Sequence, residues 1–188
     1  GAGAIYLDGT NAVSSNGGDI TFGGGLDDGG GGDLSGRVAN DGVPDGYAKA
    51  VSGWRYTTPG NIVGVWLKSG FQLLSAGGSI HLNGQGLIGG GADNMGVALE
   101  TGLVFSGNGK IAIVGRGPNT CSSSWNRGIY TGWGGNTVIA SNSSASDAIY
   151  MRGNTSDCGN TTNTQASAIQ GGDGYTCLLY TSPSPRDS

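Results

Sequence analysis

Acidic side chains that could bind a hard cation gather in one stretch of the 188-residue chain. Asp27, Asp28 and Asp33 lie in the segment LDDGGGGDL, and Asp41 and Asp45 follow. Oxygen ligands from loops suit Ca²⁺. The segment does not fit the nonapeptide GGxGxDxUx of calcium-binding repeats, and its composition is typical of a flexible acidic loop. We favour the loop and expect no cofactor, with Ca²⁺ on Asp27, Asp28 and Asp33 as the alternative.

Carboxylates could also act as a catalytic pair. Cleavage of a glycosidic bond needs two carboxyl groups about 5–10 Å apart. Asp27, Asp28 and Asp93 could supply them, and Glu100 is the only glutamate. None of these lies within a strand flanked by basic residues, and aspartate is a preferred turn former. We therefore predict no catalytic residue and no enzymatic activity.

Cysteine and histidine give little support for a metal site. Cys121 and Cys158 both lie in polar loops rich in Asn and Ser, without a CxxC spacing. A disulfide between them is one prediction, and two unpaired thiols are the alternative. His81, the only histidine, alternates between Ile80 and Leu82, so we expect it to point outward.

These residues are positioned by a block that recurs along the chain. Residues 63–86 read VGVWLKSGFQLLSAGGSIHLNGQG, and residues 95–117 read MGVALETGLVFSGNGKIAIVGRG, 32 residues later with one residue fewer. Residues 4–25 match the first block without gaps at an offset of 60. Further starts lie near residues 128 and 148. Repetition at such a period is typical of stacked arrays.

Within each block the apolar residues alternate, which is the signal of short β-strands. Two strong strands flank a weaker one around Val13, Leu73 or Phe105, and glycine clusters separate them. We predict an all-β, right-handed parallel β-helix, a solenoid of three-strand coils of about 22 residues plus variable loops. Coils start near residues 4, 64, 96, 128 and 148, and residues 26–61 form an insertion. An antiparallel β-sandwich is the alternative.

The alignment of the blocks places outward side chains in register. The residue between the paired aliphatics of the first strand is Tyr6, Trp66, Ala98, Tyr130 or Tyr150. Stacking would bring these residues into an exterior column. We favour a ladder that stabilises the sheet. The functional hypothesis is a ligand-facing platform of Tyr6, Trp66, Tyr130 and Tyr150 for sugar rings or a partner surface.

Composition and charge exclude several classes of partner. The chain has 41 glycines and a net charge of -4, and its Lys and Arg form no basic stripe, so we expect no nucleic-acid partner. No stretch approaches the roughly 20 apolar residues of a transmembrane segment.

Residues 177–187 read CLLYTSPSPRD, which matches the translation of a transposase-type sequencing-library adapter. We therefore predict a repeat fragment over residues 1–176, open at both ends, and a non-native tail over residues 177–188.

The pattern GVxLxxG…S…GGxIxLxGxG with Asn/Gly-rich spacers resembles the filamentous-haemagglutinin-like and autotransporter-type β-helical adhesins of bacteria. The resemblance covers residues 4 to about 153. It implies a secreted or cell-surface protein that attaches to host or environmental surfaces, including glycans, and that is exported with an outer-membrane secretion partner. One alternative is a fragment of a β-helical polysaccharide lyase or glycoside hydrolase. Another is a passive structural spacer.

Overall fold

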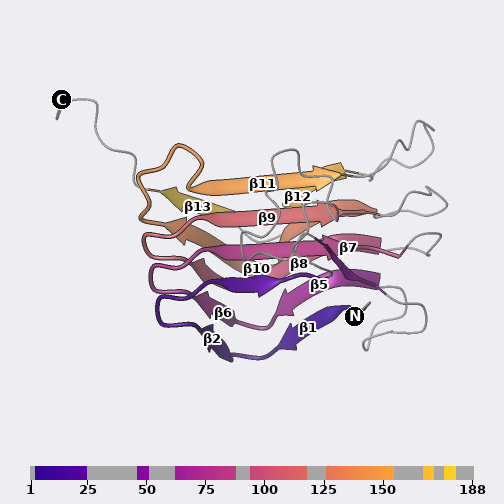
Figure 1. Ribbon diagram of the computed structural model, residues 1–188. Helices are drawn as coiled ribbons and strands as arrows, with labels where there is room; N and C mark the ends of the chain where they lie inside the picture. The colour runs from indigo at the N-terminus through magenta and orange to yellow at the C-terminus, as the bar shows by residue number, and fades with distance from the viewer. Residues whose placement is uncertain are drawn as a thin grey trace.

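The computed structural model describes residues 3–24, 46–50, 62–87, 94–117, 126–154, 167–171 and 176–180. Every regular element in these residues is a β-strand, which confirms the all-β prediction (Figure 1). The described residues accordingly include no helix that could cross a membrane. The strands form two sheets of eight and five strands.

The eight-stranded sheet, called the first sheet below, contains β1 (Ile5–Asp8), β2 (Ala12–Ser14), β5 (Ile62–Lys68), β6 (Phe71–Leu74), β8 (Asn94–Phe105), β10 (Arg127–Ser141), β12 (Ser167–Gly171) and β13 (Thr176–Tyr180). The five-stranded sheet, called the second sheet, contains β3 (Ile20–Phe22), β4 (Ala48–Lys49), β7 (Ile80–Gln85), β9 (Ile111–Arg116) and β11 (Ile149–Asn154). All pairs between these strands are parallel, which rules out the antiparallel sandwich for them.

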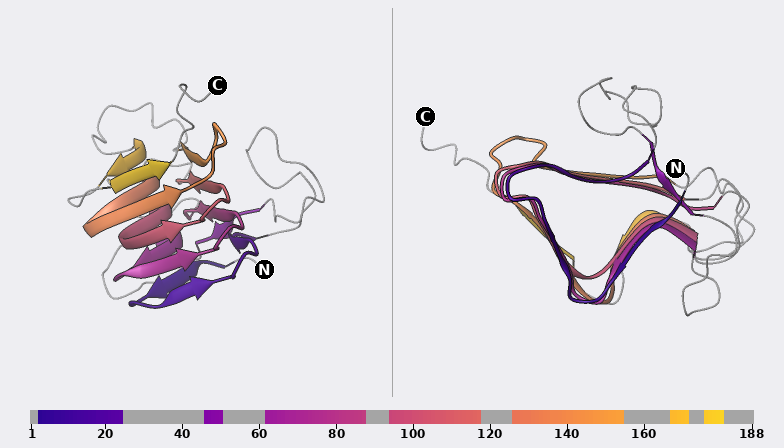
Figure 2. Two further views of the ribbon diagram at one scale, coloured as in Figure 1. Left: turned by 90° about the vertical axis from the view of Figure 1, so that its left-hand side faces the viewer. Right: turned by 60° about the horizontal axis from the view of Figure 1, so that its bottom comes forward.

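Equivalent strands of successive blocks pair with one another in register. Val65 of β5 pairs with Ile5 of β1 and with Val97 of β8, and Val97 pairs in turn with Ile129 of β10. These are the partners that the offsets of 60 and 32 residues predict. Seen along the stack, the blocks superpose (Figure 2, right). The repeat therefore sets the strand pairing.

The predicted right-handed parallel β-helix of three-strand coils is wrong. The first and second strands of a block belong to one sheet, because β5 and β6 both pair with β8. β10 spans both positions as a single strand. The bend between the first and second strands keeps its hydrogen bonds, since Gly70 N donates to Thr101 O at 2.7 Å. The two parallel sheets lie side by side, and in the described residues no block closes into a coil.

The one-residue difference between blocks lies at this bend. Ser69 and Gly70 have φ angles of 63° and 87° and separate β5 from β6. β8 lacks the additional residue and continues through, so Phe71 pairs with Gly102 and Leu73 with Val104. The alignment of Leu73 with Phe105 is therefore wrong by one position. A Cβ at Gly102 would meet the Phe71 ring at 2.4 Å, so this ring needs glycine opposite it.

The apolar core lies between the two sheets. Its fully buried side chains come from matching positions of successive blocks: Val65, Leu67, Phe71, Leu73, Ile80, Leu82, Val97, Leu99, Val104, Ile111, Ile113, Ile129 and Ile139. Full burial of one such side chain contributes about 1.5–3 kcal/mol relative to exposure. A single block leaves both edges of its strands without partners. Neighbouring blocks pair with these edges and therefore stabilise one another.

A ladder of buried serines marks the turn between the sheets. Ser75 Oγ donates to Gly78 O and, at 3.1 Å, to Ser106 O of the next block. Ser106 Oγ donates to Gly109 O at 2.6 Å, and Ser141 Oγ reaches Gly109 O at 2.7 Å. The recurrent Ser before the glycine pair thus satisfies backbone carbonyls within a block and between blocks.

The pairing of four further strands, β4, β11, β12 and β13, bears on the predicted block starts, the insertion and the tail. β11 pairs with β9 in the second sheet, so the start near residue 148 is wrong. The next first strand is β12, where Ile169 pairs with Ile129. Within the predicted insertion, β4 pairs with β7 beyond the end of β3. β13 pairs with the second half of β10. The adapter origin of residues 177–188 stays a prediction.

Candidate functional site

Three of the predicted aromatic residues come together on the outer face of the first sheet. Tyr6 pairs with Trp66, Trp66 with Ala98, and Ala98 with Tyr130. The rings of Tyr6 and Trp66 meet edge to face with centroids 5.1 Å apart, a favourable geometry for an aromatic pair. We call these four residues the aromatic row.

The aromatic row is largely buried. Trp66 is 5% exposed and Tyr130 is 7% exposed, and both belong to a cluster with Val63 and Met95. Tyr6 is partly buried against the same cluster. Rings in this state stabilise the sheet through contact with their neighbours. The arrangement supports the ladder interpretation and leaves Trp66 and Tyr130 with little surface for a ligand.

Charged side chains pack against this row. Lys68 Nζ lies 5.2 Å from the centroid of the Trp66 ring, and Arg127 Cζ lies 4.4 Å from the centroid of the Tyr130 ring. Cations at such distances are attracted by the negative face of the ring. Trp66 Nε1 also donates a hydrogen bond to Glu100 Oε1 at 2.7 Å. The buried ring therefore has partners for both its face and its polar edge.

Two carboxylates flank the aromatic row, and their pKa values are shifted in opposite directions. Hydrogen bonds from the Ser69 and Tyr6 side chains lower the pKa of Asp8, and Tyr6 Oη lies 2.7 Å from Asp8 Oδ2. Burial raises the pKa of Glu100, although the Trp66 hydrogen bond opposes the increase. Lys68 lies between the two acids, as the register partner of Asp8 on β5. At mildly acidic pH, Asp8 is thus the more ionised of the two.

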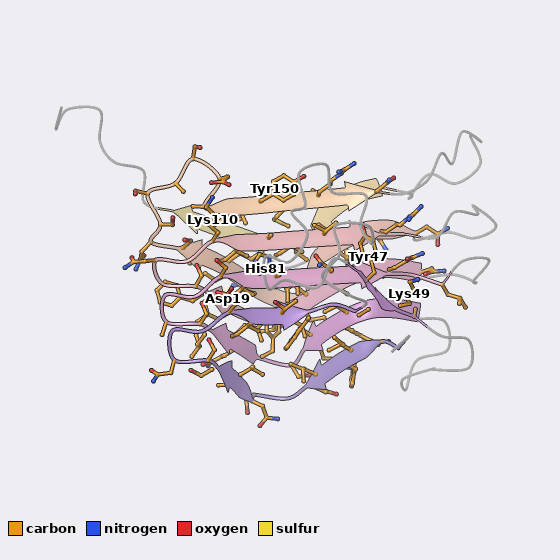
Figure 3. The ribbon with its side chains drawn as sticks, in the orientation of Figure 1. Asp19, Tyr47, Lys49, His81, Lys110 and Tyr150 are labelled. Atoms are coloured by element: carbon orange, nitrogen blue, oxygen red, sulfur yellow. The ribbon has the colours of Figure 1, made fainter. Side chains whose placement is uncertain are left out.

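One row on the outer face of the second sheet is more open than the aromatic row. Register places Thr21, His81, Ala112 and Tyr150 in one row on this face. Tyr150 is 42% exposed and is the most exposed of the four predicted aromatics. His81 lies on the outer face, as its alternation with Ile80 and Leu82 predicts (Figure 3). Tyr150 is thus separated from the aromatic row and belongs to the other sheet.

Charges on the second sheet divide between the two ends of its strands. Near the strand starts, Lys110 Nζ forms an exposed ion pair with Asp147 at 2.8 Å. There, too, Asp19 Oδ1 accepts a hydrogen bond from Ser79 N at 2.7 Å. Lys49 and Arg116 are the last residues of β4 and β9, and Arg152 lies two residues before the end of β11.

The other predicted site residues cannot be placed. Asp27, Asp28, Asp33, Cys121 and Cys158 all lie outside the described residues. Within the residues that are described, no group of three His, Cys, Asp or Glu side chains could hold a metal ion. Calcium binding and the disulfide therefore stay predictions.

Sequence reasoning missed two arrangements. The first is the contact between Trp66 and Glu100, which joins neighbouring blocks. The second is the row of Lys49, Gln85 and Arg116 at the ends of their strands. Gln85 and Arg116 occupy the same place in GQG and GRG. The block alignment could therefore have revealed that pair, whereas the pairing of β4 with β7 has no repeat signal.

Comparison with protein families, curated proteins and solved structures finds no match to this chain. What the fold and the two faces define is a class: an all-β repeat protein built of two parallel sheets. The resemblance to haemagglutinin-like adhesins stays a prediction drawn from the sequence pattern.

Proposed function

We propose that this chain is a repeat segment of a secreted or cell-surface bacterial protein that attaches to glycans or other surfaces without catalysis. The observation that carries the proposal is the exposed ring of Tyr150 on the outer face of the second sheet. Tyr150 is 42% exposed there and lies in one row with His81. Tyrosine is enriched at interfaces because its ring is apolar and its hydroxyl can stay hydrated, and the flat face of such a ring suits a sugar ring.

Further support comes from the rest of β11. Arg152 and Asn154 follow Tyr150 at two-residue intervals and therefore lie on the same face. An aromatic ring beside guanidinium and amide groups offers both a stacking surface and hydrogen-bond partners for hydroxyl groups. Host or environmental glycans are the proposed partners. An outer-membrane secretion partner and a bacterial surface location follow from the sequence resemblance alone.

Binding to immobilised glycans tests this proposal. The folded chain should be retained on a glycan panel, and Tyr150→Ala should weaken the retention about tenfold, because aromatic anchors dominate binding energies. Thr21→Ala, in the same row, is the matched control and should change retention less than about twofold. A folded wild-type chain that no glycan or cell surface retains would reject the proposal in favour of a passive spacer.

A polysaccharide-active enzyme is the second candidate, and one observation favours it. Asp8 and Glu100 have pKa values shifted in opposite directions, as an acid and base pair requires. They lie on β1 and β8 with β5 between them, so their strands are about 10 Å apart. Inverting glycosidases hold their two carboxyl groups about 6.5–9.5 Å apart, a spacing that side chains from strands so placed can reach.

Release of reducing ends or unsaturated products from polysaccharides tests the second candidate. The enzyme hypothesis predicts that Asp8→Asn and Glu100→Gln each abolish a measurable wild-type activity. A wild-type chain that cleaves no polysaccharide on the same panel would exclude it and leave the attachment proposal intact.

A further inference from the structure

Three neighbouring side chains on the outer face of the second sheet have a small residue at their centre. His81 of β7 pairs with Ala112 of β9, and Ala112 pairs with Tyr150 of β11. Neighbouring strands are about 4.8 Å apart, so β7 and β11 lie about 10 Å apart with β9 between them. The position between His81 and Tyr150 therefore carries only a methyl group. We call these three residues the alanine row.

The alanine row is open, and the same face is closed further along its strands. Tyr150 is 42% exposed, and His81 and Ala112 are partly exposed. Two residues later on β7 and β9, Asn83 and Val114 lie on the same face but are only 1% and 3% exposed. On these two strands, the accessible strip therefore ends at the alanine row.

Charged groups border the alanine row where the strands start. Lys110 lies two residues before Ala112, and its Nζ contacts Asp147 at 2.8 Å (Figure 3). The hydrogen bond from Lys110 lowers the pKa of Asp147, so this carboxylate is ionised at neutral pH and only accepts hydrogen bonds. Asp19, which precedes β3, is a second exposed carboxylate. The described charges on this border are thus one cation and two carboxylates.

This combination suits an uncharged sugar. The exposed ring of Tyr150 offers a flat apolar surface beside the small Ala112. Sugar hydroxyl groups both donate and accept hydrogen bonds, so they can bind a carboxylate and an ammonium group at the same time. An acidic sugar would meet two carboxylates and a single ammonium group, and like charges brought together are unfavourable.

We propose that the alanine row binds one ring of an uncharged polysaccharide, which stacks on Tyr150 and extends over Ala112, with its hydroxyl groups at Lys110 and Asp147. This inference rests on the proposed attachment function and names its ligand class. Ala112 sets access to the site, because it is the smallest residue in the register row that also contains Thr21, His81 and Tyr150. A larger side chain at this position would occupy the place of the sugar.

Oligosaccharides of equal length test the inference: hexasaccharides of glucose, mannose and galactose, and an acidic hexasaccharide of uronic acid. At about 0.15 M salt we expect the wild-type chain to bind at least one neutral hexasaccharide about tenfold more tightly than the acidic one. Ala112→Leu should weaken this binding about tenfold, because the leucine side chain clashes with the sugar. Thr21→Leu introduces the same side chain in the same row, two strands away, and should change binding less than about twofold.

Hydroxyl-radical footprinting of the wild-type chain gives a second test that does not depend on the folding of a variant. A saturating neutral hexasaccharide should lower the labelling of Tyr150 and His81 together. Tyr6, which lies on the other sheet, should keep its labelling rate and serves as the control. Thermal unfolding shows whether Ala112→Leu is folded, and the footprint decides the question if it is not.

Undiminished binding by folded Ala112→Leu, or a footprint that leaves both Tyr150 and His81 unprotected, would overturn the inference while leaving glycan attachment in place. Equal or tighter binding of the acidic hexasaccharide would overturn the assignment to uncharged sugars. If the chain binds neither these hexasaccharides nor any member of the glycan panel, both proposals fail.

Discussion

The outer faces of the two sheets arise from the same alternation of inward and outward residues, but their aromatic side chains differ in exposure. On the first sheet, Trp66 and Tyr130 are 5% and 7% exposed and pack in a cluster. On the second sheet, Tyr150 is 42% exposed. A position that points away from the core is therefore not necessarily a position on the surface. Trp66 and Tyr130 pack in a cluster with Val63 and Met95, whereas Tyr150 lies on β11 at the end of its sheet.

The charged side chains of the two faces also differ in what surrounds them. On the first sheet, Lys68 and Arg127 lie over the Trp66 and Tyr130 rings, so their charges interact with side chains of the protein itself. On the second sheet, Lys49 and Arg116 are the last residues of β4 and β9, and Lys49 is exposed. We interpret the first face as a structural surface and the second as the binding surface.

Removal of the largest ring on the structural face should have the largest effect. Trp66→Ala should lower the free energy of unfolding by about 3–5 kcal/mol, because it deletes a buried ring that contacts Tyr6 and Lys68. Urea denaturation followed by circular dichroism measures the change.

Tyr150→Ala is the matched comparison on the other face. It should change the free energy of unfolding by less than about 0.5 kcal/mol, because surface substitutions are usually that small. Equal losses for Trp66→Ala and Tyr150→Ala would contradict the distinction between the faces.

A subtler change isolates the polar edge of Trp66. Trp66→Phe keeps most of the ring but removes the Nε1 donor to Glu100. We expect a loss of about 1 kcal/mol, the ordinary net contribution of one hydrogen bond. The same urea titration measures it. If Trp66→Phe were as unstable as Trp66→Ala, ring packing would not be the main contribution of this residue.

The pH dependence of stability should reveal Glu100. Burial raises its pKa in the folded state above the ordinary value of 4.5, so the folded state binds more protons than the unfolded state just above pH 4.5. Glu100 therefore makes stability fall as pH rises through this window. Asp8, with a lowered pKa, acts oppositely and only below its ordinary value of 3.8.

Glu100→Gln should flatten the decrease above pH 4.5 in urea midpoints measured at closely spaced pH values. Asp8→Asn should leave that window unchanged and serves as the control. A decrease of the same size in Glu100→Gln and in wild type would show that another group causes it.

The smallest effect should come from the exposed ion pair on the second sheet. Lys110→Ala breaks the 2.8 Å contact with Asp147. We expect a loss of less than about 1 kcal/mol, because exposed ion pairs are screened by water and salt. A loss as large as that of Trp66→Ala would mean that this face is as structural as the first.

The sequence predicted the strand pairing well because pairing follows the repeat. The partners of Val65 and Ile80 in neighbouring blocks are those that the block alignment indicates, once the missing residue is moved to the bend at Ser69 and Gly70. Its position could not be predicted, because alternation on either side of the bend looks the same. In the structure, the pairing of Phe71 with Gly102 and the positive φ angles of Ser69 and Gly70 mark this position.

The sequence predicted the site less well. Residues 148–151 read AIYM and match the first strand of a block, yet Tyr150 pairs with Ala112 of the second sheet. Strands of both sheets alternate identically, so a short match cannot distinguish them. The outward direction of Trp66 was predictable, but its burial in a cluster with Val63 and Met95 was not.

Hydroxyl-radical footprinting read by mass spectrometry tests the difference between the faces most directly. Each side chain is compared with its own labelling rate in the urea-unfolded chain. We predict that Trp66 and Tyr130 are protected several-fold more strongly than Tyr150, in line with exposures of 5%, 7% and 42%. Labelling of Trp66 and Tyr130 at the same relative rate as Tyr150 would contradict the account.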